Sequence, residues 1–445
     1  MKRWTIALGL LVAGCATYRP EPLTESPPTL APPVAAIIAR DAAAIERPFL
    51  RPAIIDLSQP LDANAVATLA VLLNPDLRAQ RQRAGVADAQ AFAAGLLPDP
   101  TFSFGANQVL SGPDPLLGLA STLGFNLNAL RTRRVARAQA EAQARQVRLD
   151  LAWAEWQISG QARIQAAKVV ELEKAEGLAR ASRDSAQSIL DRMLRAAGRG
   201  DILPDQVQAA RLAAFDAADR LRTAERDLAT ARSELSRLMG LPPGYPLRLA
   251  SVMPSPPAPD AAALFAIAQR ERADLQALRA GYAAQEAAVH KAVLDQFPTL
   301  DLTINGARDT AGNLTIGPSV AFTLPLWNRN RGGIAVERAT RAQLRAEYEA
   351  RLFQTRAEIA AAVDALTVLR RQREAILRDL PALERFASAN RHAADRGDLS
   401  LVTAMNAEQA ARDKEILLAQ AEQGIAEQTI ALELLTGVPQ EAWTR

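Results

Sequence analysis

The chain has 445 residues, with 52 Lys and Arg against 49 Asp and Glu, and only one Cys. A formal net charge of +3 is too small for a general polyanion binder, so we expect no nucleic acid partner. One Cys excludes a disulfide framework and a cysteine-rich zinc site. The mean hydropathy of -0.06 excludes a polytopic helical membrane protein. Aromatic residues make up 4% of the chain against 49% hydrophobic, and this favours long, closely packed, Ala- and Leu-rich helices.

The N-terminus has the pattern of an export signal. Lys2 and Arg3 precede an apolar run that ends in Val12-Ala13-Gly14-Cys15, and this run is too short to span a bilayer as a helix. The small residues before Cys15 are typical of a bacterial lipoprotein box. We predict a signal peptide over 1–14 and a covalent lipid on Cys15, with an ordinary cleaved signal or a reduced Cys in an apolar segment as the alternatives. Ala16 after it, by resemblance to enterobacterial lipoproteins, indicates the outer membrane.

Residues 15–60 are predicted to be a lipidated N-terminal tether. Prolines recur in this segment at positions 20, 22, 27, 28, 32, 33, 48, 52 and 60. Such spacing favours extended backbone over packed helix. We therefore expect a loose segment that runs along a surface from the lipid to the body.

The body is predicted to be a duplicated unit. Asp76 and Asp274 are 198 residues apart, as are Pro100 and Pro298. Gly240 and Gly437 match at 197, and a near-constant offset of this kind is the sign of an internal repeat. The first repeat covers 61–240 and the second 261–440. A Pro-rich linker over 241–260, expected to lie at the equator of the molecule, joins them, and 441–445 form a C-terminal tail.

Each repeat is predicted to contain a helix, a β-hairpin, a very long helix, a turn and a returning helix. The hairpins cover 100–128 and 298–326, the long helices 130–197 and 329–395, and the returning helices 203–239 and 400–436. The first long helix would be a rod of about 100 Å at 1.5 Å per residue, and Pro381 would kink the second. The first returning helix has a heptad seam of Leu221, Ala224, Leu228, Ala231, Leu235 and Leu238.

The four predicted strands alternate apolar and polar residues. In the third strand Leu300, Leu302 and Ile304 fall on one face, opposite Asp301, Thr303 and Asn305. This period fits outer-membrane barrel strands, and it also fits a half-buried soluble sheet. Four strands cannot close a membrane barrel, whose minimum is about eight, and open edges are not stable in lipid. If the strands span a membrane, several chains must therefore pool them.

Over about 62–440 the order of these features resembles the TolC family of outer membrane efflux proteins. The resemblance depends on the doubling, the lipoprotein box, Leu96-Leu97-Pro98-Asp99-Pro100 before a strand and Leu324-Pro325-Leu326-Trp327 before a helix. It implies a mainly α fold with a small β part, in which a homotrimer pools twelve strands into an outer-membrane barrel above a periplasmic tunnel of helices.

The resemblance also implies a function. The chain would be the passive exit duct of a tripartite efflux system, with a periplasmic adaptor (membrane fusion protein) and an inner-membrane pump as partners. It is similar to the lipoprotein branch that serves resistance-nodulation-division pumps; type I secretion is the other use of the family. The inner-membrane partner usually selects the cargo, so metal ions, drugs and secreted proteins all remain open.

Two matching turns carry the predicted docking and gating residues. Gly200 and Gly397 end the long helices, and Asp201 and Asp398 are predicted to cap the helices that follow. In the family these turns are the periplasmic tips, where the adaptor docks and the tunnel is pinched shut. The family often has two acidic residues past the second turn, where this chain has Thr403 and Asn406. We predict a gate opened by an iris-like rotation of the tip helices, with salt bridges that involve the side chains of Arg391, Asp395 and Arg396.

Other residues give weaker signals. His290 and His392 are isolated, so we predict no metal site, no cofactor beyond the lipid, and no enzyme, since no phosphate loop or nucleophile motif occurs. Trp153 and Trp156 are predicted to pack, and Trp327 to mark a membrane or equatorial boundary. A solvated face near the barrel mouth is expected for Arg131, Arg133 and Arg134, with phosphate binding as the less favoured alternative. The alternative function is a structural or tethering coiled-coil lipoprotein without channel activity.

Overall fold

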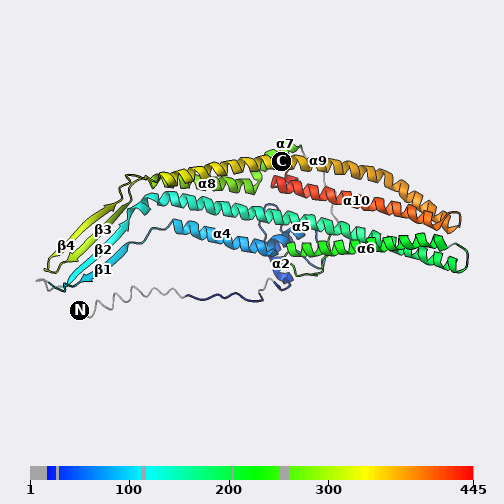
Figure 1. Ribbon diagram of the computed structural model, residues 1–445, viewed down its shortest axis with the longest axis horizontal. Coiled ribbons are helices and arrows are strands. Elements are labelled where there is room, and N and C mark those ends of the chain that lie inside the picture. The colour runs from blue at the N-terminus through cyan, green and yellow to red at the C-terminus, as the bar shows by residue number, and fades with distance from the viewer. Residues whose placement is uncertain (1–17, 27–29, 112–116, 203, 251–259, 444–445) are drawn as a thin grey trace.

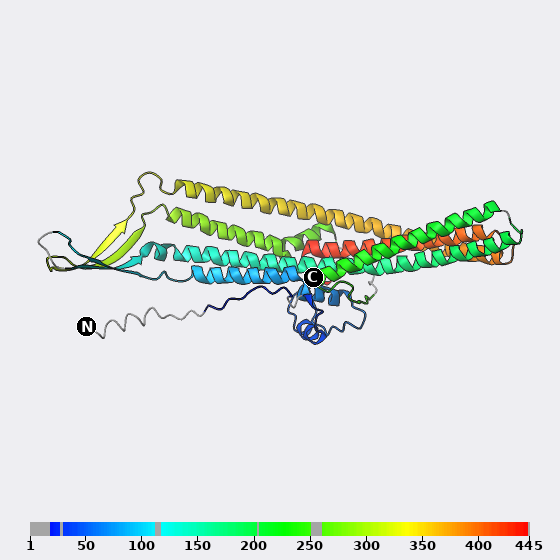
Figure 2. The ribbon, with the colours of Figure 1, turned by 60° about the horizontal axis from the view of Figure 1, so that its bottom comes forward.

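The computed structural model describes residues 18–26, 30–111, 117–202, 204–250 and 260–443. The predicted signal peptide and Cys15 lie outside these ranges. The protein is a long rod with a β-sheet at one end and two helix turns at the other (Figure 1). The C-terminus lies near the middle of the rod, and so does a small N-terminal lobe (Figure 2).

Two long helices run the length of the rod. Helix α5 (Leu127–Gly198) has 72 residues and α9 (Arg331–Asp395) has 65, which correspond to roughly 110 and 100 Å. Helix α9 continues through Pro381 without interruption, and its C-terminal part bends towards the turn end in Figure 1. No helix in the described part of the chain is both long enough and apolar enough to cross a membrane.

Shorter helices lie end to end beside each long one. Helices α4 (Pro75–Ala94) and α6 (Pro204–Leu238) lie beside α5 (Figure 1). Helices α8 (Ala273–Leu294) and α10 (Leu401–Thr436) lie beside α9 in the same way. Helix α5 also contacts α8 and α10, so it joins the two repeats. The predicted heptad seam of α6 faces α5. Its buried members are Leu221, Leu228, Ala231, Leu235 and Leu238.

The junction between α4 and α6 is a tight polar joint. Asn74, the N-cap of α4, is 1% exposed. Its side-chain NH₂ donates to the carbonyl oxygen of Leu238 at 3.0 Å, and its side-chain oxygen accepts from the backbone N–H of Asp76 and Leu77. Two helix ends therefore satisfy each other's free backbone groups through one amide.

The second repeat has the same joint with different chemistry. Arg272, the N-cap of α8, is 2% exposed, and its guanidinium donates to the carbonyl oxygen of Leu435 at 3.2 Å. Gly240 and Gly437 follow the returning helices with φ of 62° and 78°. A Cβ on Gly240 would lie 2.4 Å from the carbonyl oxygen of Leu73. The matched glycines of the sequence repeat are thus the points where the chain approaches its own backbone.

The strands form one antiparallel sheet in the order β1-β2-β3-β4. They are β1 (Thr101–Asn107), β2 (Gly118–Asn126), β3 (Leu300–Arg308) and β4 (Leu314–Phe322). The central pair, β2 and β3, joins the hairpins of the two repeats. The predicted fold class, mainly α with a small β part built from a duplicated unit, is confirmed by this arrangement.

The prediction of a loose tether up to residue 60 was wrong for its second half. Ala35–Ala43 form helix α2, and Ile38 and Ala42 are buried in a core shared with α3 (Ala63–Leu73), α5 and α6. Leu61 pairs with Leu249 of the Pro-rich linker. The Ala-rich run between the prolines at positions 33 and 48 suffices for two helical turns, because Ala favours helix and burial offsets the cost of forming so short a helix. Helix α7 (Ala261–Glu271) and the 3₁₀ turn η2 (Gln440–Ala442) complete the middle of the rod.

Replacing Gly240 with Ala should lower the free energy of unfolding by about 1–3 kcal/mol, the usual cost of a strained backbone position. The new Cβ would meet the carbonyl of Leu73 at a positive φ. Gly177→Ala is the matched control, because Gly177 is exposed within α5 and a Cβ added there would have no neighbouring atom within 4 Å. It should stabilise by about 0.5–1 kcal/mol. Chemical unfolding followed by circular dichroism measures both, and equal effects would refute the role given to the joint.

Candidate functional site: the two ends and the middle of the rod

The sheet at one end of the rod has one apolar and one polar face. Phe125, Leu302 and Val320 lie opposite one another across β2, β3 and β4, and Leu123 and Ile304 form a second apolar pair. On the other face the Thr122 hydroxyl lies 3.0 Å from the side-chain oxygen of Asn305. The alternation read from the sequence is therefore confirmed as two distinct faces.

The apolar face is uncovered in the single chain. Its large side chains are mostly exposed: Phe102, Phe104, Ile304, Ile316, Val320 and Phe322. The outer edges of β1 and β4 have no strand beside them within the described sheet. An apolar surface of this extent and two free edges are features that normally mark an interface.

At the opposite end of the rod, the two turns have the same geometry. Gly200 and Gly397 have φ of 78° and 87°. Each following Asp donates its backbone N–H to the carbonyl oxygen five residues earlier, at 3.0 Å from Asp201 and 2.9 Å from Asp398. This is the hydrogen bond of a glycine-terminated helix.

The prediction that Asp398 caps the helix after its turn was wrong. The cap of α6, predicted for Asp201, lies outside the described residues. Ser400 is the N-cap of α10, and its hydroxyl accepts from the backbone N–H of Val402. Asp398 instead pairs with Arg396 at 3.0 Å, and Asp201 with Arg199 at 2.8 Å. Each acid follows its arginine by two residues, so the nearest partner is a guanidinium in its own turn.

Behind the turns, Glu408 of α10 connects three helices. Its carboxylate lies 3.0 Å from Nη1 of Arg391 on α9 and 3.3 Å from Nη2 of Arg412. It also accepts a hydrogen bond of 3.2 Å from the hydroxyl of Ser185 on α5. The side chain of Glu408 is only 16% exposed, so these contacts are less screened than those of the surface turns.

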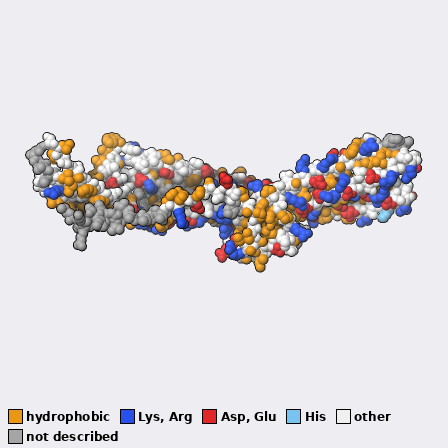
Figure 3. Space-filling model, turned by 90° about the horizontal axis from the view of Figure 1, so that it is seen from below, with side chains coloured by type: hydrophobic (Ala, Val, Ile, Leu, Met, Phe, Trp, Pro, Cys, Tyr) orange, Lys and Arg blue, Asp and Glu red, His pale blue; other side chains and the backbone are white. Residues whose placement is uncertain are grey.

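The predicted gate residues fall into three groups. Arg391 and Asp395 are 3.6 Å apart, and Asp395 also lies 3.9 Å from Arg192 of α5. Arg396, in contrast, contacts the acid of its own turn. Thr403 and Asn406 are exposed on α10. Figure 3 shows charged side chains spread over this turn half, with hydrophobic ones gathered on the lobe in the middle.

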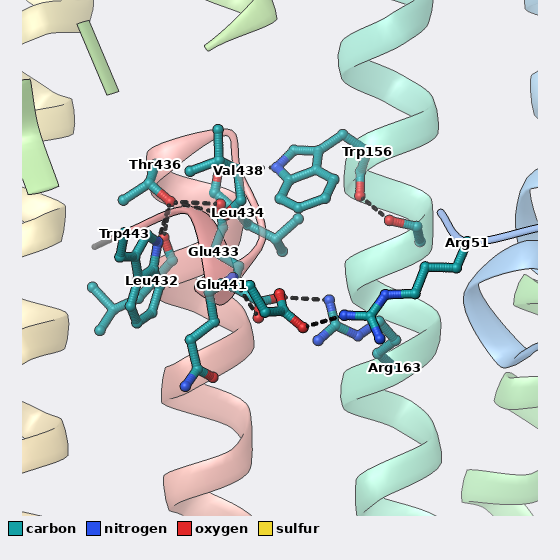
Figure 4. Close-up of polar contacts among 12 residues, drawn as sticks. Arg51, Trp156, Arg163, Leu432, Glu433, Leu434, Thr436, Val438, Glu441 and Trp443 are labelled. Atoms are coloured by element: carbon teal, nitrogen blue, oxygen red, sulfur yellow. Dashed lines mark hydrogen bonds and ion pairs between the residues drawn. The ribbon is translucent and has the colours of Figure 1, made fainter. Parts of the chain in front are cut away.

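In the middle of the rod, buried polar side chains tie the C-terminal segment to the first repeat (Figure 4). Glu433 of α10 is 4% exposed and pairs with Arg163 of α5 at 2.5 Å. The Trp443 indole N–H donates to the Thr436 hydroxyl at 3.1 Å, and the Trp156 indole N–H reaches the carbonyl oxygen of Leu434 at 3.4 Å. Trp156 is thus a packing residue, as predicted, with its polar edge satisfied.

Glu155 of α5 is the most enclosed acid of this region, with 2% exposure. It pairs with Arg47 of the N-terminal lobe at 2.5 Å and with Arg81 of α4 at 2.7 Å. Burial alone raises the pKa of Glu155, but hydrogen bonds and charge from the two arginines outweigh burial and hold the pKa below its ordinary value. The carboxylate is therefore charged at neutral pH and fastens the lobe to the rod.

Several other residues singled out in the sequence contact neighbouring segments of the chain. Trp153 lies under the guanidinium of Arg272 at 4.7 Å. The predicted solvated face at the start of α5 was wrong for Arg131 and Arg133, which donate to the carbonyl oxygens of Pro298 and Gly95, because the carbonyls of adjoining helix ends lie within their reach. Within the described ranges no three His, Cys, Asp or Glu side chains are close enough to hold a metal ion.

Sequence reasoning missed Glu155, Glu408 and Glu433. The signal available was an acid within a largely apolar helix face, as for Glu155 in the run Leu151-Ala-Trp-Ala-Glu155-Trp156. Buried acids of this kind need a cationic partner. The partners lie 270 residues apart for Glu433 and Arg163, so the helix packing was needed to identify them.

Comparison with known proteins supports the sequence-based resemblance. Residues 264–438 match a family model described as "Outer membrane efflux protein". A comparison with curated protein sequences found no match.

Among solved structures, the fold is similar to the CmeC outer membrane channel of Campylobacter jejuni, with a TM-score of 0.73, 16% identity, and coverage of 84% of this chain and 85% of that one. The outer membrane protein VceC of Vibrio cholerae matches with a TM-score of 0.71, 17% identity, and coverage of 85% and 96%. The outer-membrane channel OprN matches with 0.70, 18%, and coverage of 95% and 99%. The resemblance to the TolC family of outer membrane efflux proteins is confirmed by the family match together with this fold.

Replacing Glu155 with Gln should lower the free energy of unfolding by about 3–5 kcal/mol at neutral pH, because two arginines lose their buried partner. The native pKa of Glu155 lies below the ordinary 4.5, so its contribution is present above that pH and is lost as the pH falls through the native value. Urea unfolding between pH 7 and pH 3 should show the difference from wild type shrinking. Glu141→Gln on the same helix, whose partner Arg137 is exposed, should change little at any pH. A constant difference down to pH 3 would contradict the assignment.

Proposed function

We propose that three copies of this chain pool their sheets into a twelve-stranded barrel in the outer membrane and their helices into a periplasmic tunnel. The observation that carries this proposal is the four-stranded sheet with an uncovered apolar face and two free edges. In lipid every backbone polar group needs an internal partner, so the free edge of β4 must pair with β1 of another copy. Three copies give a strand number above the minimum of about eight.

The helical part supports the same assembly. Large apolar side chains stay exposed on the helices at the two sides of the rod, on α9 at Phe353, Val368 and Phe386 and on α6 at Leu212 and Phe215. Helices α6 and α9 lie at opposite ends of the row α6-α5-α10-α9 formed by the helix contacts. A neighbouring copy would therefore place its α9 beside α6 and close the row into a ring.

The duct has no chemistry of its own in this proposal. A periplasmic adaptor docks at the turns around Gly200, Asp201, Gly397 and Asp398, and an inner-membrane pump delivers and selects the cargo. A lipid on Cys15 anchors each copy in the outer membrane, as in the lipoprotein branch of the family. The alternative, a coiled-coil lipoprotein without channel activity, predicts sheets that never enter lipid and membrane fractions that do not conduct.

The sheet assignment is tested by adding one charge to either face. Ile304→Lys places a cation on the apolar face near the middle of β3 and should cost about 2–4 kcal/mol at the centre of a bilayer. Thr303→Lys is the matched control, because the polar face would line the water-filled interior. We expect heat-resistant oligomers and membrane insertion to be lost with Ile304→Lys and kept with Thr303→Lys. Equal behaviour of the two variants would favour the coiled-coil lipoprotein.

We also propose that Glu408 holds the periplasmic end closed. Its hydrogen bond from Ser185 joins α10 to α5, and its ion pair with Arg391 joins α10 to α9. An iris-like rotation of the tip helices would have to break these contacts. This role replaces the acidic pair that the family often has, since Thr403 and Asn406 carry no charge.

Glu408→Gln should therefore raise the basal conductance of the purified oligomer in planar bilayers. The carboxylate would no longer pair with Arg391 and Arg412, while size and shape change little. Asp219→Asn is the matched control, because it removes only an exposed pair with Arg222 within α6, and it should leave conductance unchanged. A wild-type channel that is already wide open, or one that neither substitution affects, would rule out this gate.

A further inference from the structure

A groove lies at the foot of the sheet, where strands pass into helices. Its volume is about 600 Å³. It is bounded by the end of α8, the start of β3, the end of β4 and the first turns of α5, which meet there in Figure 1. The lining residues are Arg131, Leu294, Phe297, Pro298, Leu300 and Phe322.

The groove continues the apolar face of the sheet. Leu300 and Phe322 are directly paired across β3 and β4 at the end of that face, 42% and 58% exposed. Phe297, between α8 and β3, is 53% exposed. An apolar chain lying along the face would therefore run into the groove without leaving apolar contact.

Arg131 closes the helical end of the groove and carries a charge without an acidic partner. Its Nη1 donates to the carbonyl oxygen of Pro298 at 3.2 Å and its Nη2 to the side-chain oxygen of Asn128 at 2.5 Å. Its Nε is buried and has no hydrogen-bond partner. No carboxylate of the described chain forms an ion pair with it, and Asp295, which follows the lining residue Leu294, is paired with Lys291 at 2.9 Å. The groove is thus cationic at one end and apolar along its length.

We propose that this groove binds a phospholipid of the periplasmic leaflet, with the phosphate at Arg131 and an acyl chain against Leu300 and Phe322. The inference rests on the proposed membrane-spanning role of the sheet. The direction of the site agrees with that role, because the cationic end points to the helices and the apolar end to the strands. A charge-assisted hydrogen bond from a guanidinium is the usual way to hold a phosphate.

A second copy is the competing occupant. It would pair with the free edge of β4, whereas the groove opens on the face that β3 and β4 share. In that arrangement the exposed Asp99 of the second copy, just before β1, would be the acid that could pair with Arg131 of the first copy. The phospholipid is favoured because it matches both the charge and the length of apolar surface.

The test is native mass spectrometry of the full-length oligomer released from nanodiscs of phosphatidylcholine with or without phosphatidylglycerol. We expect phosphatidylglycerol to be retained at one site per chain in the wild type. Arg131→Gln should weaken this retention roughly tenfold, since hydrogen bonds to charged groups contribute about that factor. Arg131→Lys should keep part of it. Arg134→Gln is the matched control, on an exposed arginine of the same helix, and should bind as the wild type does.

A photoreactive residue at position 300 gives a second measurement that does not need the arginine variants to fold. Crosslinking to lipid supports the proposal, and crosslinking to a second copy overturns it. Equal retention of phosphatidylglycerol by Arg131→Gln and the wild type in the mass spectrometry experiment also overturns it. Bilayer conductance of the same samples distinguishes failure of the groove proposal from failure of the channel proposal. Conducting oligomers without site-specific lipid would refute the groove and leave the proposed channel intact, whereas samples that never insert would refute both.

Discussion

The structure depends on a constraint of length: a helix of 72 residues cannot be stabilised along its whole length by one ordinary helix. Two shorter helices therefore lie end to end beside it, and their meeting point would leave free N–H and C=O groups buried. One side chain resolves this in each repeat, Asn74 bonding to Leu238 and Arg272 to Leu435. The glycines at 240 and 437 let the backbones approach closely enough for that contact. Without these side chains, the backbone carbonyls of Leu238 and Leu435 would lose hydrogen-bond donors where the shorter helices meet.

The joints also explain why so many buried charges collect in the middle of the rod. Glu155, Glu433 and Arg272 are each less than 5% exposed, and each connects segments distant in the sequence. Buried ion pairs contribute little net stability compared with apolar packing, but a missing partner is costly. Such pairs therefore select one arrangement of the N-terminal lobe, the rod and the C-terminal segment over others. The Ala-rich helix faces alone would permit sliding, because they have few large side chains to interlock.

The two ends of the rod differ in what holds them. The sheet has large apolar side chains facing outwards and few charges, so its stability must come from a surrounding medium or from other copies. The turn end is held by a network of partly exposed ion pairs centred on Glu408, whose individual strength is modest. The proposed duct would use this contrast, since its sheet end would stay fixed in the membrane while its turn end would change shape. The groove proposed to hold a lipid lies at the foot of the sheet, between these two ends.

The duplication, the long helices, the heptad seam and the two-faced strands could all be predicted from the amino-acid sequence, because each follows from local periodicity or from a constant offset between repeats. It also led to Gly240 and Gly437, since a repeated glycine is visible without a structure. It failed where a residue's role depends on burial or on which partner lies nearest: Asp398 pairs with Arg396 in its own turn instead of capping, residues 35–43 are helical and packed, and Glu155 and Glu408 were not recognised. The packing of the helices decides the roles of the two acids, because the partners of Glu155 lie 74 and 108 residues away and one partner of Glu408 lies 223 residues away.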